Sequence, residues 1–205
     1  MPPKPERRPE LIRPDPERWR VFLAIELPEA VRTALQAPID GLRALGDSLR
    51  VNSVERIHLT LHFLGHLPVE DVDALQPAVK RAVGEEPRMR LVARGVGAFP
   101  NFNRAQVLWA GIAGEDVPRL TGLQRALGEA LRGAGIVPEN DERFHPHLTL
   151  ARVRRPIRGQ ALAAWQRQWL EIEFGVIPVP AVSLIRSQLG SGPPRYSQLA
   201  SFSLQ

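Results

Sequence analysis

The sequence of 205 residues contains no cysteine. This absence excludes disulfide bonds, thiolate metal ligands and a thiol nucleophile. No hydrophobic run approaches the roughly 20 residues that a membrane-spanning helix needs. Met1 is followed by prolines and charges rather than by the apolar segment of a secretion signal. We therefore expect a cytoplasmic protein that makes no contact with a membrane.

Lysine is also scarce, since Lys4 and Lys80 are the only two, and nearly all of the positive charge behind the net charge of +5 is arginine. Guanidinium groups suit bidentate contacts with phosphate, so the composition is compatible with an RNA or nucleotide partner. An arginine excess also follows from a GC-rich genome, so charge alone does not decide the partner. The content of 43% hydrophobic and 24% charged residues is typical of a globular protein, and we expect a monomer.

Hydrophobic patterns predict a defined order of strands and helices. Residues 1–18 are rich in proline and charge and predict a flexible extension, followed by a single domain over residues 19–205. The first half reads as a strand over 20–27, a helix after Pro28, a strand with His58, a helix over 69–83 and an extended run over 88–96. Pro38 is expected to break or kink the first helix, because proline lacks the amide hydrogen that a helix needs.

The same order then restarts. The second half reads as a strand over 106–112, a helix from Val117 that ends at Gly133 or Gly135, a strand with His147, a short helix with Trp165, and strands near 170–174, 181–189 and 197–204. Val107 follows Val21 by 86 residues, and His147 follows His58 by 89. This nearly constant offset indicates an internal duplication. We predict a duplicated, bilobal α+β fold, in which two antiparallel sheets flanked by helices surround a central cleft with pseudo-two-fold symmetry.

Two short segments share one motif. Residues 57–61 read IHLTL and residues 146–150 read PHLTL. Because successive side chains of a strand point to opposite faces, His58 and Thr60 share one face, and His147 and Thr149 do the same in the second copy. Each copy therefore presents one imidazole beside one hydroxyl.

Two such faces supply the groups that open a cyclic phosphate without a metal or any other cofactor. One histidine takes a proton from water while the other protonates the departing ribose oxygen, and the pKa of histidine, about 6.5, suits both roles. Thr60 and Thr149 would donate hydrogen bonds to the non-bridging phosphate oxygens. A single strand histidine is usually structural, but the repetition at the duplication offset favours catalysis by His58 and His147.

A metal site is the main chemical alternative, because all five histidines fall in two clusters. His58, His62 and His66 would line one side of a helix, and His145 and His147 form the second cluster. Alternation over residues 57–64 favours a strand instead, with His62 on the same face as His58. The glutamate that a zinc hydrolase needs between its histidines is absent. We therefore predict no metal.

Five segments carry a resemblance to a known family: residues 21–25, 58–65, 97–100, 107–111 and 144–152. They resemble the bacterial and archaeal RNA 2′,3′-cyclic phosphodiesterases, historically called 2′-5′ RNA ligases, of the two-histidine phosphoesterase superfamily. The resemblance covers residues 19 to 205. It implies a bilobal fold with a V-shaped cleft and the opening of 2′,3′-cyclic phosphates on RNA 3′ ends or oligonucleotides to 2′-phosphomonoesters. It also implies the reverse, ligating reaction.

The resemblance assigns roles to individual residues. His58 would donate the proton to the leaving 3′ oxygen, and His147 would accept the proton from water. His62 and His145 stand where the family often has a basic residue, so His62 is a candidate phosphate contact. Arg152 matches the family's arginine and is a candidate substrate ligand, although strict alternation from His147 would turn it away from the cleft.

Two aromatic residues complete the candidate substrate contacts. Tyr196 and Phe22 are candidates for stacking on a base or ribose, but for Phe22 core packing is the favoured role.

Two other functions stay open at the level of sequence. The same site would also suit small cyclic phosphates such as ADP-ribose 1″,2″-cyclic phosphate or a cyclic nucleotide. A non-catalytic module that holds RNA ends would use the basic surface alone. The second alternative does not explain why two groups that titrate near neutrality are both present.

Overall fold

The computed structural model describes residues 17–139, 144–157, 160–190 and 192–205. Its strands are β1 (Arg18–Ile25), β2 (Leu49–Val51), β3 (Leu59–Pro68), β4 (Met89–Phe99), β5 (Val107–Ala113), β6 (His147–Val153), β7 (Glu173–Val179), β8 (Ala181–Gln188) and β9 (Arg195–Ser203). Its α-helices are α1 (Glu29–Arg43), α2 (Val69–Ala74), α3 (Gln76–Val83), α4 (Val117–Gly133) and α5 (Gln160–Trp169), with 3₁₀ turns η1 (Val54–Arg56) and η2 (Phe102–Arg104).

The extension predicted for residues 1–18 lies outside the described residues, except for its last two. Arg18 already belongs to β1, so the first strand begins two residues earlier than the sequence pattern predicts. Among the described residues, no helix is long and apolar enough to cross a membrane.

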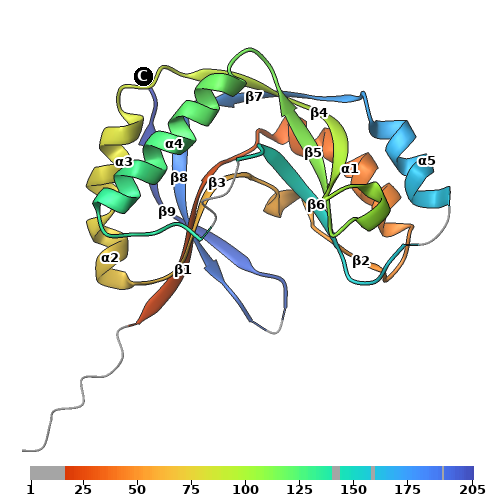
Figure 1. Cartoon of the computed structure of the whole chain (residues 1–205), viewed down its shortest axis with the longest axis horizontal. Coiled ribbons are helices and arrows are strands. Elements are labelled where there is room, and N and C mark those ends of the chain that lie inside the picture. Colours follow the sequence, from red (N-terminus) through yellow and green to blue (C-terminus); the bar gives the residue numbers. More distant parts are fainter. Residues whose placement is uncertain (1–16, 140–143, 158–159, 191) are drawn as a thin grey trace, which may run out of the picture.

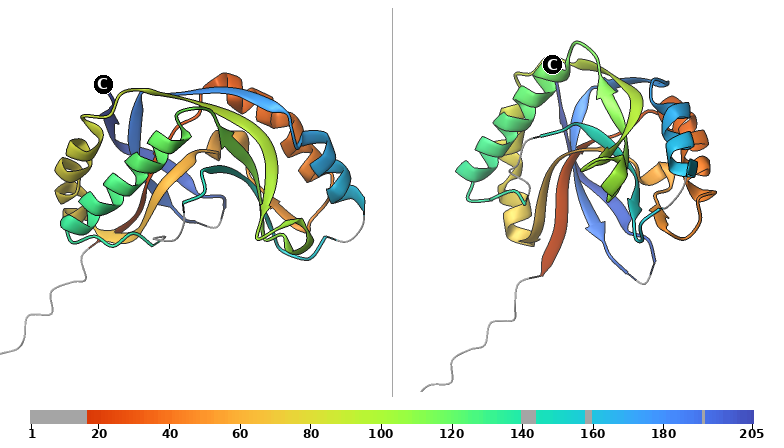
Figure 2. Two further views of the ribbon diagram at one scale, coloured as in Figure 1. Left: turned by 45° about the horizontal axis from the view of Figure 1, so that its top comes forward. Right: turned by 45° about the vertical axis from the view of Figure 1, so that its right-hand side comes forward.

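One arched antiparallel sheet organises the chain. Its order is β7-β4-β5-β6-β3-β1-β8-β9, and β2 pairs with β6 beside β3. The two halves of the sheet meet at β3 and β6 through a single pair, Leu59 and Leu148. Helices lie on the outer, convex side, and the concave side stays open (Figure 2). The predicted α+β class is confirmed, and the two antiparallel sheets that it foresaw are the halves of one continuous sheet.

Each half of the sheet is covered by a helix that follows a strand of the other half. Helix α1 follows β1 but packs against β2 and β7, whereas α4 follows β5 but packs against α3 and β3 (Figure 1). The two repeats are therefore interlocked by their own connections, and neither half of the sheet is covered by its own sequence repeat alone.

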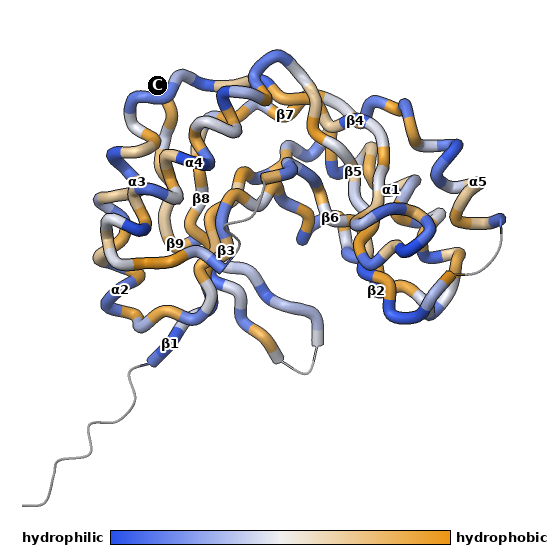
Figure 3. The backbone as a smooth tube through the Cα atoms, viewed as in Figure 1, coloured by the Kyte–Doolittle hydropathy of each residue, from blue (hydrophilic) through white to orange (hydrophobic). Residues whose placement is uncertain are grey.

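Alternation along β1 separates the core from the cleft. Val21, Leu23 and Ile25 belong to the main hydrophobic core between sheet and helices. Phe22 and Ala24 point to the other face and form a small second cluster with Ile185. The helices alternate between hydrophilic and hydrophobic residues along their length, as expected for elements with one buried side (Figure 3).

The prolines behave differently from one helix to the next. Of the break or kink expected at Pro38, the break does not occur, because α1 runs unbroken from Glu29 to Arg43. Several side chains of this helix are fully buried, among them Val31, Leu35, Ile39 and Leu42, and this burial offsets the missing hydrogen bond. The single helix expected over 69–83 is instead divided at Leu75 into α2 and α3, since Pro77 has no amide hydrogen to continue the ladder.

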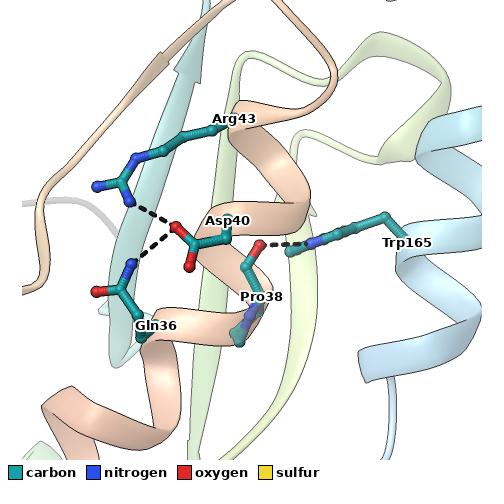
Figure 4. Close-up of polar contacts among 5 residues, drawn as sticks. All are labelled: Gln36, Pro38, Asp40, Arg43 and Trp165. Atoms are coloured by element: carbon teal, nitrogen blue, oxygen red, sulfur yellow. Dashed lines mark hydrogen bonds and ion pairs between the residues drawn. The ribbon is translucent and has the colours of Figure 1, made fainter.

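Trp165 ties helix α5 to α1 at this proline. Its indole Nε1–H donates a hydrogen bond to the carbonyl of Pro38 at 2.9 Å (Figure 4). On the same helix, the Asp40 carboxylate accepts hydrogen bonds from Gln36 and Arg43 at 2.8 and 2.6 Å. Trp165 is 4% exposed, so its hydrogen bond lies in the protein interior.

We predict that Trp165→Phe destabilises the protein by about 1 kcal/mol more than Trp169→Phe. The two substitutions remove the same atoms, but the buried indole nitrogen of Trp169 has no hydrogen-bond partner among the described residues. Urea unfolding of the two variants measures the difference. Equal losses of stability would show that the bond to Pro38 contributes nothing beyond packing.

Candidate active site

The pair that joins the two halves of the sheet lies at the centre of both motifs. Leu59 stands between His58 and Thr60, and its partner Leu148 stands in the same position of the second copy. Both leucines are fully buried in the core. Because residues directly opposite in a sheet share a face, the flanking histidines and threonines of both motifs point to the concave side. The face predicted for each histidine–threonine pair is therefore the one that the structure gives them.

Each catalytic candidate is oriented by its own backbone. The Nδ1–H of His58 donates to the carbonyl of Arg56 at 3.0 Å, and the Nδ1–H of His147 donates to the carbonyl of His145 at 2.7 Å. A carbonyl only accepts, so in the neutral imidazole the proton resides on Nδ1. Nε2 is then the atom with the free lone pair in both rings. The two copies repeat this arrangement with the same spacing of two residues.

His58 is held between two aromatic rings. Phe22 stacks on its imidazole, with centroids 4.6 Å apart and planes inclined by 23°. Tyr196 meets it edge-on at 5.4 Å. Phe22 is only 2% exposed and packs in the cluster beneath the histidine. Of the two roles considered for Phe22, the structure therefore gives core packing and not a substrate contact, whereas Tyr196 lines the cleft.

His147 has different neighbours. Phe99 meets its ring edge-on at 4.9 Å, and Trp109 lies 6.4 Å away. The indole of Trp109 lies directly over Gly97, where a Cβ atom would overlap the ring. Segments 97–100 and 107–111 carried the sequence resemblance without an assigned role, and the structure shows that they form the support of the second histidine.

The two imidazoles are desolvated to different degrees. Burial lowers the pKa of His58 to about 4, against the opposing effect of the Arg56 carbonyl. Burial also lowers the pKa of His147, and the charges of Arg152 and His145 lower it further. Both histidines are therefore neutral in the free protein near pH 7, ready to accept a proton at Nε2.

A cleft of about 1100 Å³ lies on the concave side between the halves. Its wall includes His58, Thr60 and Thr149. His147 does not form part of this wall, but it lies two residues before Thr149 on the same face of β6. Five arginines line the cleft, namely Arg20, Arg50, Arg56, Arg152 and Arg154. An anionic ligand is the chemistry that this lining favours.

Arg152 reaches the cleft because of a β-bulge. Trp109 pairs with Thr149 and Leu108 pairs with Ala151, so Leu150 is an extra residue in β6. Leu150 and Ala151 are consecutive and both fully buried, which returns Arg152 to the cleft face. The expectation that strict alternation turns Arg152 away from the cleft is wrong.

Asn52 holds this bulge from the neighbouring segment. Its backbone N–H donates to the carbonyl of Leu150, and its side-chain amide donates to the carbonyl of Thr149, both at 2.8 Å. Asn52 also lines the cleft. Sequence reasoning missed it, because an isolated asparagine between a strand and a turn carries no motif.

The equivalent bulge in β3 moves His62 out of the site. Ala24 pairs with Thr60 and Leu23 pairs with His62, so Leu61 is the extra residue. His62 is 1% exposed, and its Nε2 lies 2.7 Å from the carbonyl of Gln124 on α4. The expectation that His62 shares the face of His58 is therefore wrong, and Phe63 lines the cleft in its place.

The histidine clusters do not form the helix on which a metal site would depend. His62 and His66 lie on strand β3, with His62 turned to the core and His66 exposed. The His145 ring is exposed near Phe99, and its backbone carbonyl orients His147. In the described ranges, no group of three potential metal ligands comes together.

Several cleft residues were not foreseen from the sequence. Arg20, Arg50, Arg56 and Arg154 line the cleft beside the motif residues. Arginine is so common in this chain that no single one stands out, and only the pairing of β2 with β6 shows that Arg50 and Arg152 lie directly opposite each other.

Comparison with known proteins gives a consistent family. The model of the 2′-5′ RNA ligase superfamily matches residues 31–190. The RNA 2′,3′-cyclic phosphodiesterase of Methanothermobacter thermautotrophicus is 32% identical over 186 residues, which are 90% of this chain and 98% of that protein. The protein of the same name from Thermus thermophilus is 33% identical over 188 residues, 91% of this chain and 90% of its own.

Solved structures are similar to this chain over most of its length. The crystal structure of TT0787 of Thermus thermophilus has a TM-score of 0.72 and 33% identity, covering 90% of this chain and 97% of that one. E. coli LigT complexed with 3′-AMP has a TM-score of 0.69 and 26% identity, covering 92% and 99%. The duplicated, arched sheet with one histidine–threonine pair from each half is the architecture of the two-histidine phosphoesterases. Within that class, the chain belongs to the 2′-5′ RNA ligase superfamily.

We predict that Arg152→Gln raises the pKa of His147, because the substitution removes a positive charge that disfavours the imidazolium, while the larger effect of burial stays. The pKa of His58 is set by burial and by the Arg56 carbonyl, so His58 serves as the internal control. Titration of the imidazole resonances by NMR measures both values in one sample. An unchanged pKa for His147, or equal rises for both histidines, would contradict the placement of Arg152.

Proposed function

We propose that this protein is a metal-independent RNA 2′,3′-cyclic phosphodiesterase that opens the cyclic phosphate at an RNA 3′ end to a 2′-phosphomonoester. One observation carries the proposal: a histidine–threonine pair from each half of the sheet shares a concave face with an arginine-lined cleft, and both Nε2 atoms are left free by the Nδ1 hydrogen bonds. The names of the relatives from Methanothermobacter and Thermus support the same substrate.

In this mechanism each side chain has one task. Nε2 of His147 takes a proton from water, the water oxygen bonds to phosphorus, and the bond between phosphorus and O3′ breaks. Nε2 of His58 gives a proton to O3′, so the product carries a 3′-hydroxyl and a 2′-phosphate. His147 then releases its proton to solvent, and His58 takes one up, so both rings return to their starting states. Thr60 and Thr149 donate hydrogen bonds to the non-bridging oxygens, with Arg152 on the same face.

The lowered pKa of His58 suits the proposed role once substrate is bound. A phosphodiester anion in the cleft favours the imidazolium and raises the pKa of both histidines. His58, with its pKa near 4 in the free protein, is then a strong acid toward a departing alkoxide. Burial, together with the charge of Arg152, keeps His147 neutral and able to act as the base.

A second candidate substrate is a small cyclic nucleotide. E. coli LigT has been solved with 3′-AMP, with NADP+ and with ATP, and a similar cleft here would accept one nucleotide. Its opening would use the same side chains. It differs from an RNA end only in having no further nucleotides before the cyclic phosphate. Action as a cytoplasmic monomer stays a prediction from composition.

The proposal is tested by mass spectrometry of the product from an RNA with a 2′,3′-cyclic end, incubated with the protein and EDTA. Hydrolysis adds one water, and later digestion of the product locates the phosphate on O2′ or O3′. A 2′-phosphate formed in EDTA supports the proposal. A 3′-phosphate, or turnover only after zinc is added, would overturn it.

We predict that His58→Ala and His147→Ala each lower kcat by about two to four orders of magnitude, the usual contribution of a general acid or base. His66→Ala is the matched control, since His66 is exposed on β3 and does not line the cleft. Steady-state kinetics and the circular dichroism of each variant separate lost chemistry from lost fold. Near-full activity of either single variant would contradict the two-histidine mechanism.

We predict an optimum of kcat/KM on the acidic side of pH 6.5, because this parameter reports the free protein, in which burial lowers the pKa of both histidines. The acid must be protonated and the base neutral, so the rate falls as pH rises above the higher of the two lowered pKa values. The profile of kcat shifts to higher pH, since the bound anion raises both pKa values. Rates measured from about pH 4 to 9 test this order, and a kcat/KM that still rises above neutrality would contradict it.

A further inference from the structure

A second cavity adjoins the cleft at Arg154. The cleft of about 1100 Å³ and a groove of about 410 Å³ share this arginine in their walls. The floor of the groove is apolar, formed by Phe102, Ile157 and Leu162, and its rim carries Arg104 and Arg155 beside Arg154. We call these six residues the arginine groove. Its volume lies within the range of small-molecule binding sites.

The cations of this region lack acidic partners among the described residues. Arg50 and Arg152 lie directly opposite each other in the β2–β6 pair, an arrangement that destabilises a sheet when nothing compensates it. Neither they nor the arginines of the groove form an ion pair with a carboxylate in the described part of the chain. By contrast, Arg43, Arg94, Arg119 and Arg186 each pair with an acidic side chain.

Hydrogen bonds fix the backbone of the residues that carry the groove arginines. The backbone N–H groups of Arg154 and Arg155 both donate to the carbonyl of Ser48, at 2.8 and 3.3 Å. The Asn101 side chain accepts hydrogen bonds from the N–H groups of Asn103 and Arg104, at 3.0 and 3.2 Å, and so caps the turn that presents Arg104. The arginine backbones are therefore fixed before any ligand arrives.

The side of the cleft at the β8–β9 turn carries less positive charge. Its residues near the turn are uncharged, namely Leu189, Gly190, Gly192, Pro193 and Pro194, and the lining arginine beside this turn is Arg20, which pairs with Ser187 of β8. Arg50, Arg152 and Arg154 gather on the β6 side. A 2′,3′-cyclic phosphate is the 3′ terminus of its RNA, so the rest of the strand must leave the cleft in one direction. Phosphates favour the arginine side, and the apolar floor suits a base or a ribose.

We propose that the arginine groove binds the nucleotides that precede the cyclic end of a single-stranded RNA, so that the protein prefers oligonucleotides over mononucleotides. This inference rests on the proposed function and names the substrate class of the same site. The cleft binds the terminal nucleotide, and Arg154, which lines both cavities, contacts the strand where it leaves the cleft and enters the groove.

The test compares adenosine 2′,3′-cyclic monophosphate with a six-nucleotide RNA that ends in the same cyclic nucleotide. The groove variant is Arg104→Gln/Arg155→Gln, which leaves the cleft itself intact. The matched control is Arg125→Gln/Arg167→Gln, which removes two exposed arginines from α4 and α5 outside both cavities.

For the groove variant we expect KM of the hexanucleotide to rise about tenfold near physiological salt, and the slope of log kcat/KM against log salt to become shallower by about 1.4, the value for two phosphate contacts on a single strand. Its kcat/KM for the mononucleotide stays that of the wild type. The control variant changes neither substrate. Equal KM changes for both substrates, or equal effects of the two variants, would overturn the inference.

Failure of the proposed function gives a different result. If the wild type opens neither substrate, the proposed function is wrong. Fluorescence anisotropy with a labelled hexanucleotide then tests whether the groove binds RNA, independently of catalysis. Weaker binding by the groove variant than by the control supports the inference. Equal binding by both variants rejects it.

Discussion

The site depends on one backbone pairing, that of Leu59 with Leu148. It is the single pair between β3 and β6 and the point at which the two halves of the sheet meet. Because both leucines are buried, the histidine and threonine on either side of each are turned to the concave face. A shift of the pairing by one residue would bury one motif while exposing the other.

The duplication gives the two motifs equal backbones and unequal surroundings. Each histidine donates Nδ1–H to the carbonyl two residues earlier, and each threonine is followed by a bulge. After the bulge, however, the cleft receives Phe63 in one copy and Arg152 in the other. Both histidines contact aromatic rings, but Phe22 stacks on His58, whereas His147 also feels the charge of Arg152. A symmetric scaffold thus separates two identical imidazoles into candidates for acid and base.

The sequence predicted what depends on local patterns. Strand alternation and the 89-residue offset were sufficient for the duplicated fold and for the shared face of each histidine–threonine pair. The bulges at Leu61 and Leu150 were not predictable, because they depend on how β1, β5 and Asn52 pair with the motif strands. For that reason alternation placed His62 and Arg152 on the wrong faces. Pro38 likewise stays within α1 through tertiary burial, which a helix pattern does not contain.

Backbone carbonyls fix the tautomer of both histidines and free Nε2 for proton transfer. Nitrogen-15 NMR of selectively labelled histidine measures the tautomer directly, in free protein at a pH where both rings are neutral. We expect the Nδ1–H tautomer for His58 and His147, with His66 as the solvent-exposed reference. An Nε2–H tautomer at either catalytic position would place the proton on the reacting atom and show that the carbonyls do not orient the rings.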